Sequence, residues 1–319
     1  MKKEVKNVVV IGAGRMGHGI AETFIRTGKD VFLCDLSTPL LKEAVDLVEQ
    51  ELTELSEWGA MPRREIKPTM DRLHCTTLLE EAVSSADVVI EAVPENLEVK
   101  KGVFQKLDAI CPERTVFASN SSFFGPSEYA SATNRPDRVL GAHYFYPPHL
   151  IPLVEVVRSE STSDASVEIA CDLLKSSEKT PLVVKKEVRG FIANRLQYAL
   201  QREAFYLVEQ GIASAEDIDI ATKASYGLRM PFAGIVENLE MSGSGNFEPL
   251  EAIWELIFPH LCSTTKPLSL FFEKLKRREI GSKTSPGFYD WTPGSKDARR
   301  KEVRQDLFKL LKALSTDKG

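Results

Sequence analysis

The feature that most constrains the fold of this chain is a glycine-rich turn between two short apolar runs near its start. Residues 8–11 read Val-Val-Val-Ile, residues 12–17 read Gly-Ala-Gly-Arg-Met-Gly, and the apolar run 31–34 ends at Asp35. A buried strand, a glycine turn, a helix with an apolar face and a second strand ending in an acid are typical of a βαβ unit that binds a dinucleotide. The pattern therefore predicts a doubly wound α/β domain. The alternative is a glycine-rich turn in some other α/β protein.

Each glycine of this turn has its own predicted task. Gly12 permits the tight turn, Gly14 lets the backbone approach a pyrophosphate, and Gly17 lets the next helix pack closely on the strand. The pyrophosphate then lies on free N–H groups at the helix N-terminus. Asp35 follows Gly14 by 21 residues, at the reach of an adenosine ribose. Its charge would repel a 2′-phosphate, so the sequence predicts NAD as the cofactor, not NADP.

Composition excludes several classes of protein. The chain has 319 residues, 43% of them hydrophobic and 27% charged, which is enough to build one large domain or two ordinary ones. A net charge of −5 and the lack of a long apolar run exclude nucleic acid and membrane as expected partners. The five cysteines are scattered without a CxxC pair or a Cys/His cluster, so we expect reduced thiols and no metal site. The plain expectation is a cytoplasmic enzyme.

The order of the elements predicts two domains. Strand-like and helix-like segments alternate as far as residue 185, and helix-like segments alone follow Gly190. This order predicts an N-terminal Rossmann-like, doubly wound, mostly parallel sheet over 1–188 and an all-α domain over 189–319. Besides the two strands of the first unit, strands are expected at 86–93, 116–119, around 141–145, and at 153–157 and 181–185. Helices of the second domain are expected at 191–210, 216–225, 250–258, 266–278 and 296–314.

Two residues stand out as a candidate acid–base pair. His143 lies in a strand-like segment, and Glu155 lies twelve residues later in another. An imidazole titrates near neutral pH and can take and return a proton, and a nearby carboxylate would orient the ring and stabilise its protonated form. Twelve residues are enough to leave one strand and return along its neighbour. Spacing alone leaves the alternative of a core histidine in a buried strand.

Four further residues have polar side chains near predicted element ends. Ser122 and Asn194 can bind a hydroxyl or carbonyl oxygen, but helix capping explains a serine and an asparagine there equally well. Glu95 and Lys100 follow the end of a strand, where an open α/β sheet binds its ligand. The alternative for both is a solvated helix start.

Two helices are expected to have strongly charged faces. The helix after Asp35 carries Lys42 as its one basic residue, and the last helix has a basic face that we expect to be surface. The acidic residues of the first helix are Glu43, Asp46, Glu49, Glu51, Glu54 and Glu57, and the basic residues of the last are Arg299, Arg300, Lys301, Arg304, Lys309 and Lys312.

Taken in order, the motifs resemble the 3-hydroxyacyl-CoA dehydrogenase family. They are residues 12–17, 91–96 (Glu-Ala-Val-Pro-Glu-Asn), 119–122 (Ser-Asn-Ser-Ser), 141–145 (Gly-Ala-His-Tyr-Phe), 152–157 (Pro-Leu-Val-Glu-Val-Val), 190–195 (Gly-Phe-Ile-Ala-Asn-Arg) and a C-terminal signature at 280–290. The resemblance implies that His143 is the catalytic base, that Glu155 is its partner, and that Ser122 and Asn194 bind the reacting oxygen. It also implies a helical dimerising domain. The implied cofactor contacts are Gly12, Gly14, Arg15, Met16, Gly17, Asp35, Glu95 and Lys100.

The chain departs from the family pattern near the expected substrate site. Tyr146 stands where the family has Asn, Phe123 where it has Ser, and Arg189 where it has Pro. The acidic helix after Asp35 replaces basic contacts that acyl-CoA members offer to the CoA nucleotide, although Arg63, Arg64 and Lys67 lie just beyond it. The tail after Trp291 and residues 190–198 resemble the L-gulonate 3-dehydrogenase (lambda-crystallin), carnitine dehydrogenase and pyridine-carboxylate dehydrogenase branches.

Several functions therefore stay open at this point. The family's commonest activity predicts oxidation of a short-chain L-3-hydroxyacyl-CoA of the 3-hydroxybutyryl-CoA type, in fatty acid metabolism. The alternative is a dehydrogenase of a free 3-hydroxy acid or related small alcohol. A 6-phosphogluconate-type dehydrogenase shares the glycine turn but needs a catalytic lysine in a glycine-rich helix start, which is missing here. A non-catalytic NAD-binding structural protein is also conceivable, since a fold can outlive its activity.

Overall fold

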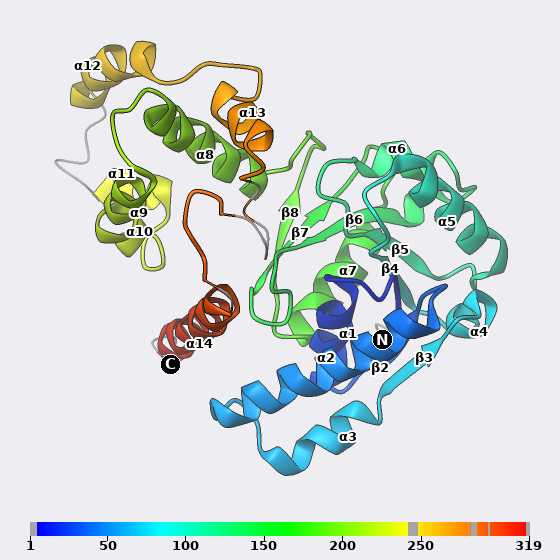
Figure 1. Ribbon diagram of the computed structural model, residues 1–319. Coiled ribbons are helices and arrows are strands. Elements are labelled where there is room, and N and C mark those ends of the chain that lie inside the picture. Colours follow the sequence, from blue (N-terminus) through cyan, green and yellow to red (C-terminus); the bar gives the residue numbers. More distant parts are fainter. Residues whose placement is uncertain (1–4, 242–247, 280, 282–285, 293, 317–319) are drawn as a thin grey trace. The chain divides into compact units, whose positions relative to one another are not determined.

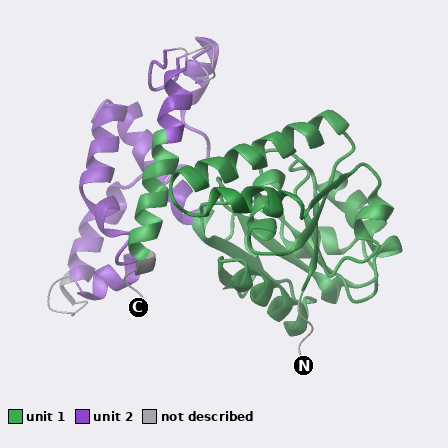
Figure 2. Ribbon diagram, turned by 90° about the horizontal axis from the view of Figure 1, so that it is seen from below, with its two compact units in different colours: residues 1–194, 302–319 green, residues 195–301 purple. Residues whose placement is uncertain are grey.

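A computed structural model describes residues 5–241, 248–279, 281, 286–292 and 294–316. Of the signature expected at 280–290, residues 280 and 282–285 lie outside these ranges. Contacts divide the chain into two compact units, Met1–Asn194 with Glu302–Gly319, and Arg195–Lys301 (Figure 2). The boundary expected at 188/189 stays a prediction. None of the helices in the described ranges combines the length and apolar composition needed to cross a bilayer.

The first unit is built on an eight-stranded sheet of order β3-β2-β1-β4-β5-β6-β7-β8 (Figure 1). Neighbouring strands are parallel except β6 and β7, which are antiparallel. The predicted α/β class with a mostly parallel sheet is confirmed. The strands are β1 Asn7–Ile11, β2 Asp30–Cys34, β3 Leu73–Thr76, β4 Val88–Glu91, β5 Val116–Ser119, β6 Val139–Tyr144, β7 Leu153–Val157 and β8 Thr180–Val184.

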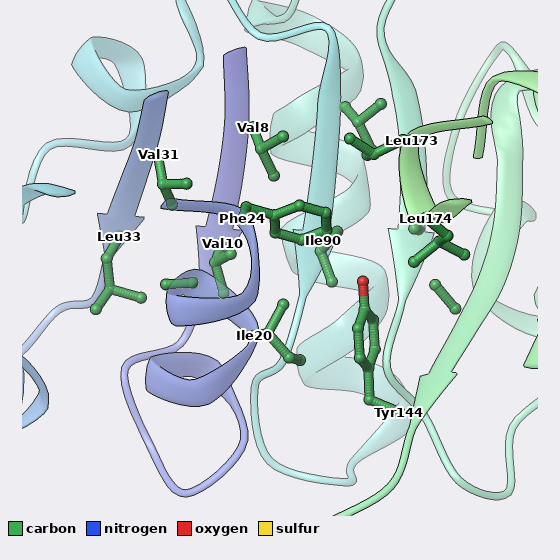
Figure 3. Close-up of a cluster of buried hydrophobic side chains, with 14 of the residues drawn as sticks. Val8, Val10, Ile20, Phe24, Val31, Leu33, Ile90, Tyr144, Leu173 and Leu174 are labelled. Carbon is green, nitrogen blue, oxygen red and sulfur yellow. The ribbon is translucent and has the colours of Figure 1, made fainter. Parts of the chain in front are cut away.

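Helices cover both faces of this sheet, which explains why β1 is apolar without alternation. Val8 and Val10 point into the core cluster shown in Figure 3, whereas Val9 and Ile11 point into the core on the opposite face. The helices of the first unit are α1 Gly17–Arg26, α2 Thr38–Glu57, α3 Ile66–Met70, α4 Leu79–Val83, α5 Leu97–Ile110, α6 Pro126–Ala130 and α7 Asp164–Ser176. The cluster in Figure 3 receives apolar side chains from α1, α2 and α7, and the other receives them from α4, α5 and α6.

One edge strand was not predicted from the sequence. Residues 73–76 read Leu-His-Cys-Thr and form β3, the edge strand beside β2. The central residues of β3, His74 and Cys75, are exposed. An edge strand with exposed polar residues has no apolar run, which is the signal that located the buried strands.

The part of the chain after Gly190 is helical, as predicted. Two short helices, α10 and α11, lie between predicted ones. The helices are α8 Ala193–Glu209, α9 Ala215–Ala224, α10 Tyr226–Arg229, α11 Ile235–Met241, α12 Glu248–Ile257, α13 Ser269–Lys276 and α14 Ser295–Thr316. Short 3-10 helices form at η1 Arg63–Glu65, η2 Pro136–Arg138 and η3 Phe258–His260.

The terminal helix contacts α2, which corrects the surface expectation for one residue of its basic face, Arg304; the other five basic residues are exposed. Arg304 donates to the two carboxylate oxygens of Glu54 at 3.2 and 3.0 Å, and the rings of Trp58 and Phe308 lie 5.6 Å apart. Glu54 is buried and Glu51 is only 16% exposed along its side chain. The contact between α14 and α2 therefore buries Glu54 and leaves the Arg304 side chain 23% exposed, whereas Glu51 faces His18 of α1.

Candidate active site

The glycine turn between β1 and α1 has the backbone geometry that the sequence predicted. Gly12 has φ +100°, and a Cβ there would lie 2.7 Å from the carbonyl oxygen of Ala92. A Cβ on Gly17 would collide with the carbonyl oxygen of Gly12, so helix and turn approach closely only without a side chain. Among the described residues, no atom lies within 4 Å of a Cβ built on Gly14. The backbone at Gly14 is thus open to a ligand, as a pyrophosphate would require.

Asp35 connects this turn to the end of β2. One carboxylate oxygen accepts from the backbone N–H of Ala13 at 2.8 Å, and the other accepts from the N–H of Ser37 at 2.9 Å. The carboxylate therefore fixes the turn and still faces the cleft beside it. This position fits the ribose contact predicted for an NAD-binding domain.

A cleft of about 620 Å³ lies at the carboxyl ends of the strands, where open α/β sheets bind ligands. The guanidinium group of Arg15 lies over the ring of Tyr146 in a cation–π contact, with the guanidinium carbon 4.0 Å from the ring centroid. The predicted site residues that line the cleft are Gly12, Gly14, Arg15, Met16, Asp35, Glu95 and Ser122. Those that do not line it are Gly17, Lys100, His143, Glu155 and Asn194. The volume and the lining together fit a dinucleotide.

Lys100 is buried and links two carboxylates under the rim of this cleft. Its Nζ lies 3.0 Å from Glu91 and 3.1 Å from Glu95. Burial raises the pKa of Glu91 above its ordinary value, despite Lys100 and a hydrogen bond from the Ser119 hydroxyl. Burial alone would also raise the pKa of Glu95, but hydrogen bonds from Ser121 and Lys100 outweigh it and lower that pKa.

The same network positions Ser122. Glu95 accepts from the Ser121 hydroxyl at 2.6 Å and from the backbone N–H groups of Ser122 and Phe123, each at 3.1 Å. Sequence reasoning missed Glu91 and Ser121 as site residues. Glu91 could have been found from the sequence, because it is a charged residue at the end of an otherwise apolar strand.

His143 and Glu155 meet as a hydrogen-bonded pair. They face each other in the antiparallel register of β6 and β7, and Nδ1 of His143 lies 2.8 Å from Oε2 of Glu155. Both are buried, at 3% and 0% exposure. The imidazole also packs between Phe145 and Phe191, with ring centroids 4.5 and 5.5 Å away. Within the described part of the chain, Nε2 has no hydrogen-bond partner, so it is the nitrogen left for a ligand.

The second oxygen of Glu155 is held by the start of α8. Its Oε1 accepts from the N–H groups of Ile192 and Ala193, both at 2.9 Å. Burial alone would raise the pKa of Glu155, but hydrogen bonds from His143 and these amides outweigh it and lower the pKa. The carboxylate therefore stays ionised and can stabilise a protonated imidazole. Asn194 follows directly and is buried.

His143 is connected to the cleft through its neighbour. The N–H of Tyr144 donates to the side chain of Asn120 at 2.9 Å, and Asn120 lines the cleft. Strand β6 pairs in parallel with β5 and continues past its end, so His143 lies at the same edge of the sheet as residues 120–122. Sequence reasoning had not singled out Asn120.

Comparison with known proteins assigns both parts of the chain to the same family. Residues 7–188 match the 3-hydroxyacyl-CoA dehydrogenase NAD binding domain, and residues 190–291 match the C-terminal domain. The chain is 30% identical to a 5-formyl-3-hydroxy-2-methylpyridine 4-carboxylate 5-dehydrogenase of Mesorhizobium japonicum, over 97% of this chain and 98% of that protein. It is 34% identical to a probable 3-hydroxybutyryl-CoA dehydrogenase of Bacillus subtilis, over 90% and 98%.

Solved structures show the same relationships. A crystal structure of a 5-formyl-3-hydroxy-2-methylpyridine 4-carboxylic acid 5-dehydrogenase has a TM-score of 0.89 at 29% identity and covers 98% of this chain and 99% of its own. The (S)-3-hydroxybutyryl-CoA dehydrogenase of Ralstonia eutropha has a TM-score of 0.74 at 28% identity and covers 91% of this chain and 100% of its own.

Proposed function

Because this chain belongs to the 3-hydroxyacyl-CoA dehydrogenase family and is an NAD-dependent dehydrogenase acting on CH–OH groups, we propose that its substrate is a small free hydroxy acid. The reaction is oxidation of the alcohol to a carbonyl, or the reverse reduction, with His143 as the general base. This choice reverses the order suggested by the family's commonest activity.

The observation that carries the substrate class is the length shared with the pyridine-carboxylate dehydrogenase. That structure matches 98% of this chain with a TM-score of 0.89, whereas the Ralstonia acyl-CoA enzyme matches 91% with 0.74. The family's C-terminal domain ends at residue 291, so α14 lies beyond it. Through Arg304 and Phe308, α14 contacts the end of α2. The family resemblance implies that this helix would face the CoA nucleotide in an acyl-CoA enzyme.

The charge of α2 supports the same choice. Its exposed acids are Glu43, Asp46, Glu49 and Glu57, against one exposed cation, Lys42. The phosphates of a CoA nucleotide would meet repulsion along this helix. A free acid of a few carbons does not extend that far from the reacting carbon.

One observation favours the acyl-CoA substrate as a second candidate. Arg63, Arg64 and Lys67 are exposed just after α2, and Arg64 has Glu65 at 3.6 Å. These three cations could offset the acidic helix and bind a phosphorylated nucleotide. Under this candidate the enzyme would take part in fatty acid metabolism.

The proposed roles follow from the chemistry of the side chains. Nε2 of His143 takes the proton of the substrate hydroxyl, and Glu155 stabilises the imidazolium that forms. Ser122 and Asn194 bind the substrate oxygen and so align the reacting carbon with the nicotinamide ring of NAD. This positioning contributes to the rate of hydride transfer. NAD, when bound, accepts the hydride from that carbon.

The residues proposed to hold NAD divide into two groups. The residues proposed for the adenosine and pyrophosphate are Gly12, Gly14, Arg15, Met16, Gly17 and Asp35. Glu95 and Lys100 are proposed at the nicotinamide half. Because Lys100 is 1% exposed and binds Glu95, its proposed contribution is to hold that carboxylate in place.

The proposal includes a cytoplasmic homodimer that associates through the helical domain, with a domain boundary at 188/189. Large apolar side chains of that domain are exposed, among them Leu228 at 65%, Phe232 at 67% and Leu256 at 75%. Exposed apolar area of this kind is typical of a surface that another subunit covers.

Initial rates of NADH formation with matched substrates test the substrate class. The substrates are 3-hydroxybutyryl-CoA, free 3-hydroxybutyrate, L-gulonate, carnitine and 5-formyl-3-hydroxy-2-methylpyridine 4-carboxylate, whose hydrated formyl group offers the CH–OH. We expect a higher kcat/KM for one of the free compounds than for the thioester. A triple variant, Arg63→Ala, Arg64→Ala and Lys67→Ala, should leave that value unchanged. A strong preference for the thioester, with a KM that rises in the triple variant, would overturn the proposal.

A further inference from the structure

A second buried group of histidines and carboxylates lies in the first unit, apart from His143. Glu22 is on α1, Glu51 is on α2, and His149 follows β6. One donor atom from each lies within 4.8 Å of the other two, and Nδ1 of His149 is 3.5 Å from an oxygen of each glutamate. The side chains of Glu22 and His149 are 0% and 2% exposed, and that of Glu51 is 16% exposed.

The atoms that face one another in this group have no hydrogen-bond partner. Among the described residues, both oxygens of Glu22, Oε2 of Glu51 and Nδ1 of His149 are buried and unpaired. Leaving buried polar or charged atoms without partners is expensive, and folded proteins rarely do so. The other buried carboxylates, such as Glu91 and Glu155, all accept hydrogen bonds. In the part of the chain that the structure describes, none of these four atoms receives a hydrogen bond from a cationic side chain.

Cations near this group are engaged elsewhere. Arg26 pairs with Glu178 at 2.7 Å, and Lys179 donates to the carbonyl oxygens of Pro148 and Ile151 at 2.5 and 3.0 Å. Arg304 is bound to Glu54. None of these bonds reaches the unpaired atoms.

His18 holds the opposite side of Glu51. Its Nε2 lies 3.3 Å from Oε1 of Glu51, and its Nδ1 lies 3.0 Å from the carbonyl oxygen of Gly14. Glu51 is therefore oriented by one oxygen while its other oxygen faces Glu22 and His149. Carboxylates that bind a metal are themselves commonly held by an outer-shell hydrogen bond, the part that His18 would have here.

We propose that Glu22, Glu51 and His149 bind one divalent transition-metal ion, with Zn²⁺ the best match. Zinc bonds of 2.0–2.1 Å in tetrahedral geometry place neighbouring ligands about 3.4 Å apart. Nδ1 of His149 lies 3.5 Å from an oxygen of each glutamate, close to this separation. An imidazole with two carboxylates suits zinc, whereas Mg²⁺ and Ca²⁺ prefer oxygen ligands alone. A water molecule or a second carboxylate oxygen completes the shell.

The site serves structure and not the reaction. It joins α1, α2 and the segment after β6, and through His18 it reaches the carbonyl group of Gly14 in the cofactor turn. A metal here would hold the start of α1 in place. This inference does not depend on which alcohol the enzyme oxidises.

Metal binding to the full-length chain tests the proposal directly. After removal of metal by a chelator, Zn²⁺ is titrated by calorimetry, and the thermal unfolding midpoint is followed with and without Zn²⁺. We expect about one equivalent bound and a midpoint that rises with zinc concentration, because the ion binds only the folded chain. Co²⁺ in place of zinc should give visible d–d bands without a thiolate charge-transfer band, which separates this site from the exposed thiol of Cys75.

Four variants assign the ligands. Glu22→Gln and His149→Gln should each abolish the tight site and the zinc-dependent rise in midpoint. His18→Gln should weaken affinity by about 10–100-fold, as outer-shell changes do. Glu54→Gln is the matched control, because Glu54 is a buried acid of the same helix that lies outside the cluster. It should leave zinc affinity unchanged.

Two results would overturn the proposal. One is a stripped wild-type chain that binds no Zn²⁺, Co²⁺ or Mn²⁺ at micromolar concentration, which would mean that a shared proton or a buried water occupies the site. The other is binding that survives in His149→Gln and Glu22→Gln. If one variant fails to fold by circular dichroism, the other decides the assignment.

Discussion

Two buried histidine–carboxylate groups of the first unit differ in how their acids are satisfied. In the pair formed by His143 and Glu155, both carboxylate oxygens accept hydrogen bonds, one from the imidazole and one from two backbone amides. In the group around Glu22, four carboxylate or imidazole atoms that face inward have no donor among the described residues. Both groups are buried to a similar degree. Burial alone therefore does not distinguish a carboxylate that orients a catalytic base from a carboxylate that is proposed to bind a metal ion.

The difference originates in the backbone. Ile192 and Ala193 lie at the beginning of α8, where helical N–H groups are free to bind an acceptor, and they are aimed at Glu155. Glu22 lies inside α1, where the N–H groups of the helix are already used. Its carboxylate can be satisfied only by a group from another segment or from solution.

Replacement of His143 should produce the largest effect and tests the catalytic side of this comparison. For His143→Ala we expect kcat to fall by about 10²–10⁴-fold, because a positioned base contributes that much. NAD affinity, measured by fluorescence titration, should stay within a small factor of the wild-type value, since His143 does not line the cofactor cleft. If His143→Ala turned over near the wild-type rate under conditions where chemistry limits kcat, His143 would not be the catalytic base. The pair would then have only a structural role, like the group around Glu22.

Replacement of Glu155 should produce the next largest effect, on stability and its pH dependence. In Glu155→Gln an amide group faces donors that the carboxylate had accepted, which should cost about 1–3 kcal/mol in the free energy of unfolding at pH 7.

The pH dependence has a defined direction. The pKa of Glu155 is lowered from its ordinary value of 4.5 in the folded chain. Its stabilising contribution is therefore complete above that value and is lost as the pH falls through the folded pKa. Urea unfolding between pH 3 and pH 7 measures this. The variant should lose less stability than the wild type over the acidic range, and an equal loss in both would contradict the assigned ionisation.

Replacement of Glu22 should have the smallest effect on the free energy of unfolding. This is the property in which the two groups should differ most. In the metal-free protein, Glu22→Gln removes an acid that has no donor, so the free energy of unfolding at pH 7 should stay the same or increase. Chemical denaturation of the chelator-treated proteins measures it. A loss as large as that of Glu155→Gln would show that Glu22 already has a stabilising partner in the metal-free chain.

Much of the first unit was predictable because its signals are local. The glycine turn and the strand around residues 88–91 follow from periodicity and turn chemistry within a few residues. The same holds for the helices after Gly190, most of which belong to the second unit. The edge strand β3 was not predictable in this way, because its residues have no apolar run. Its extended conformation is stabilised by backbone pairing with β2, a segment that is distant in sequence. The family motifs also marked His143 and Glu155 together before their hydrogen bond was visible.

The sequence by itself determined the fold class, the cofactor and the family, because each depends on short motifs whose spacing is preserved along the chain. Only the tertiary structure decided which charged side chains face inward. Arg304 and Glu54 lie 250 positions apart and meet through packing of α14 on α2. Glu22, Glu51 and His149 come from three segments, so no local pattern could join them. Contacts between distant segments are set by how the apolar faces of helices and sheet pack, and that packing leaves no short-range trace in the sequence.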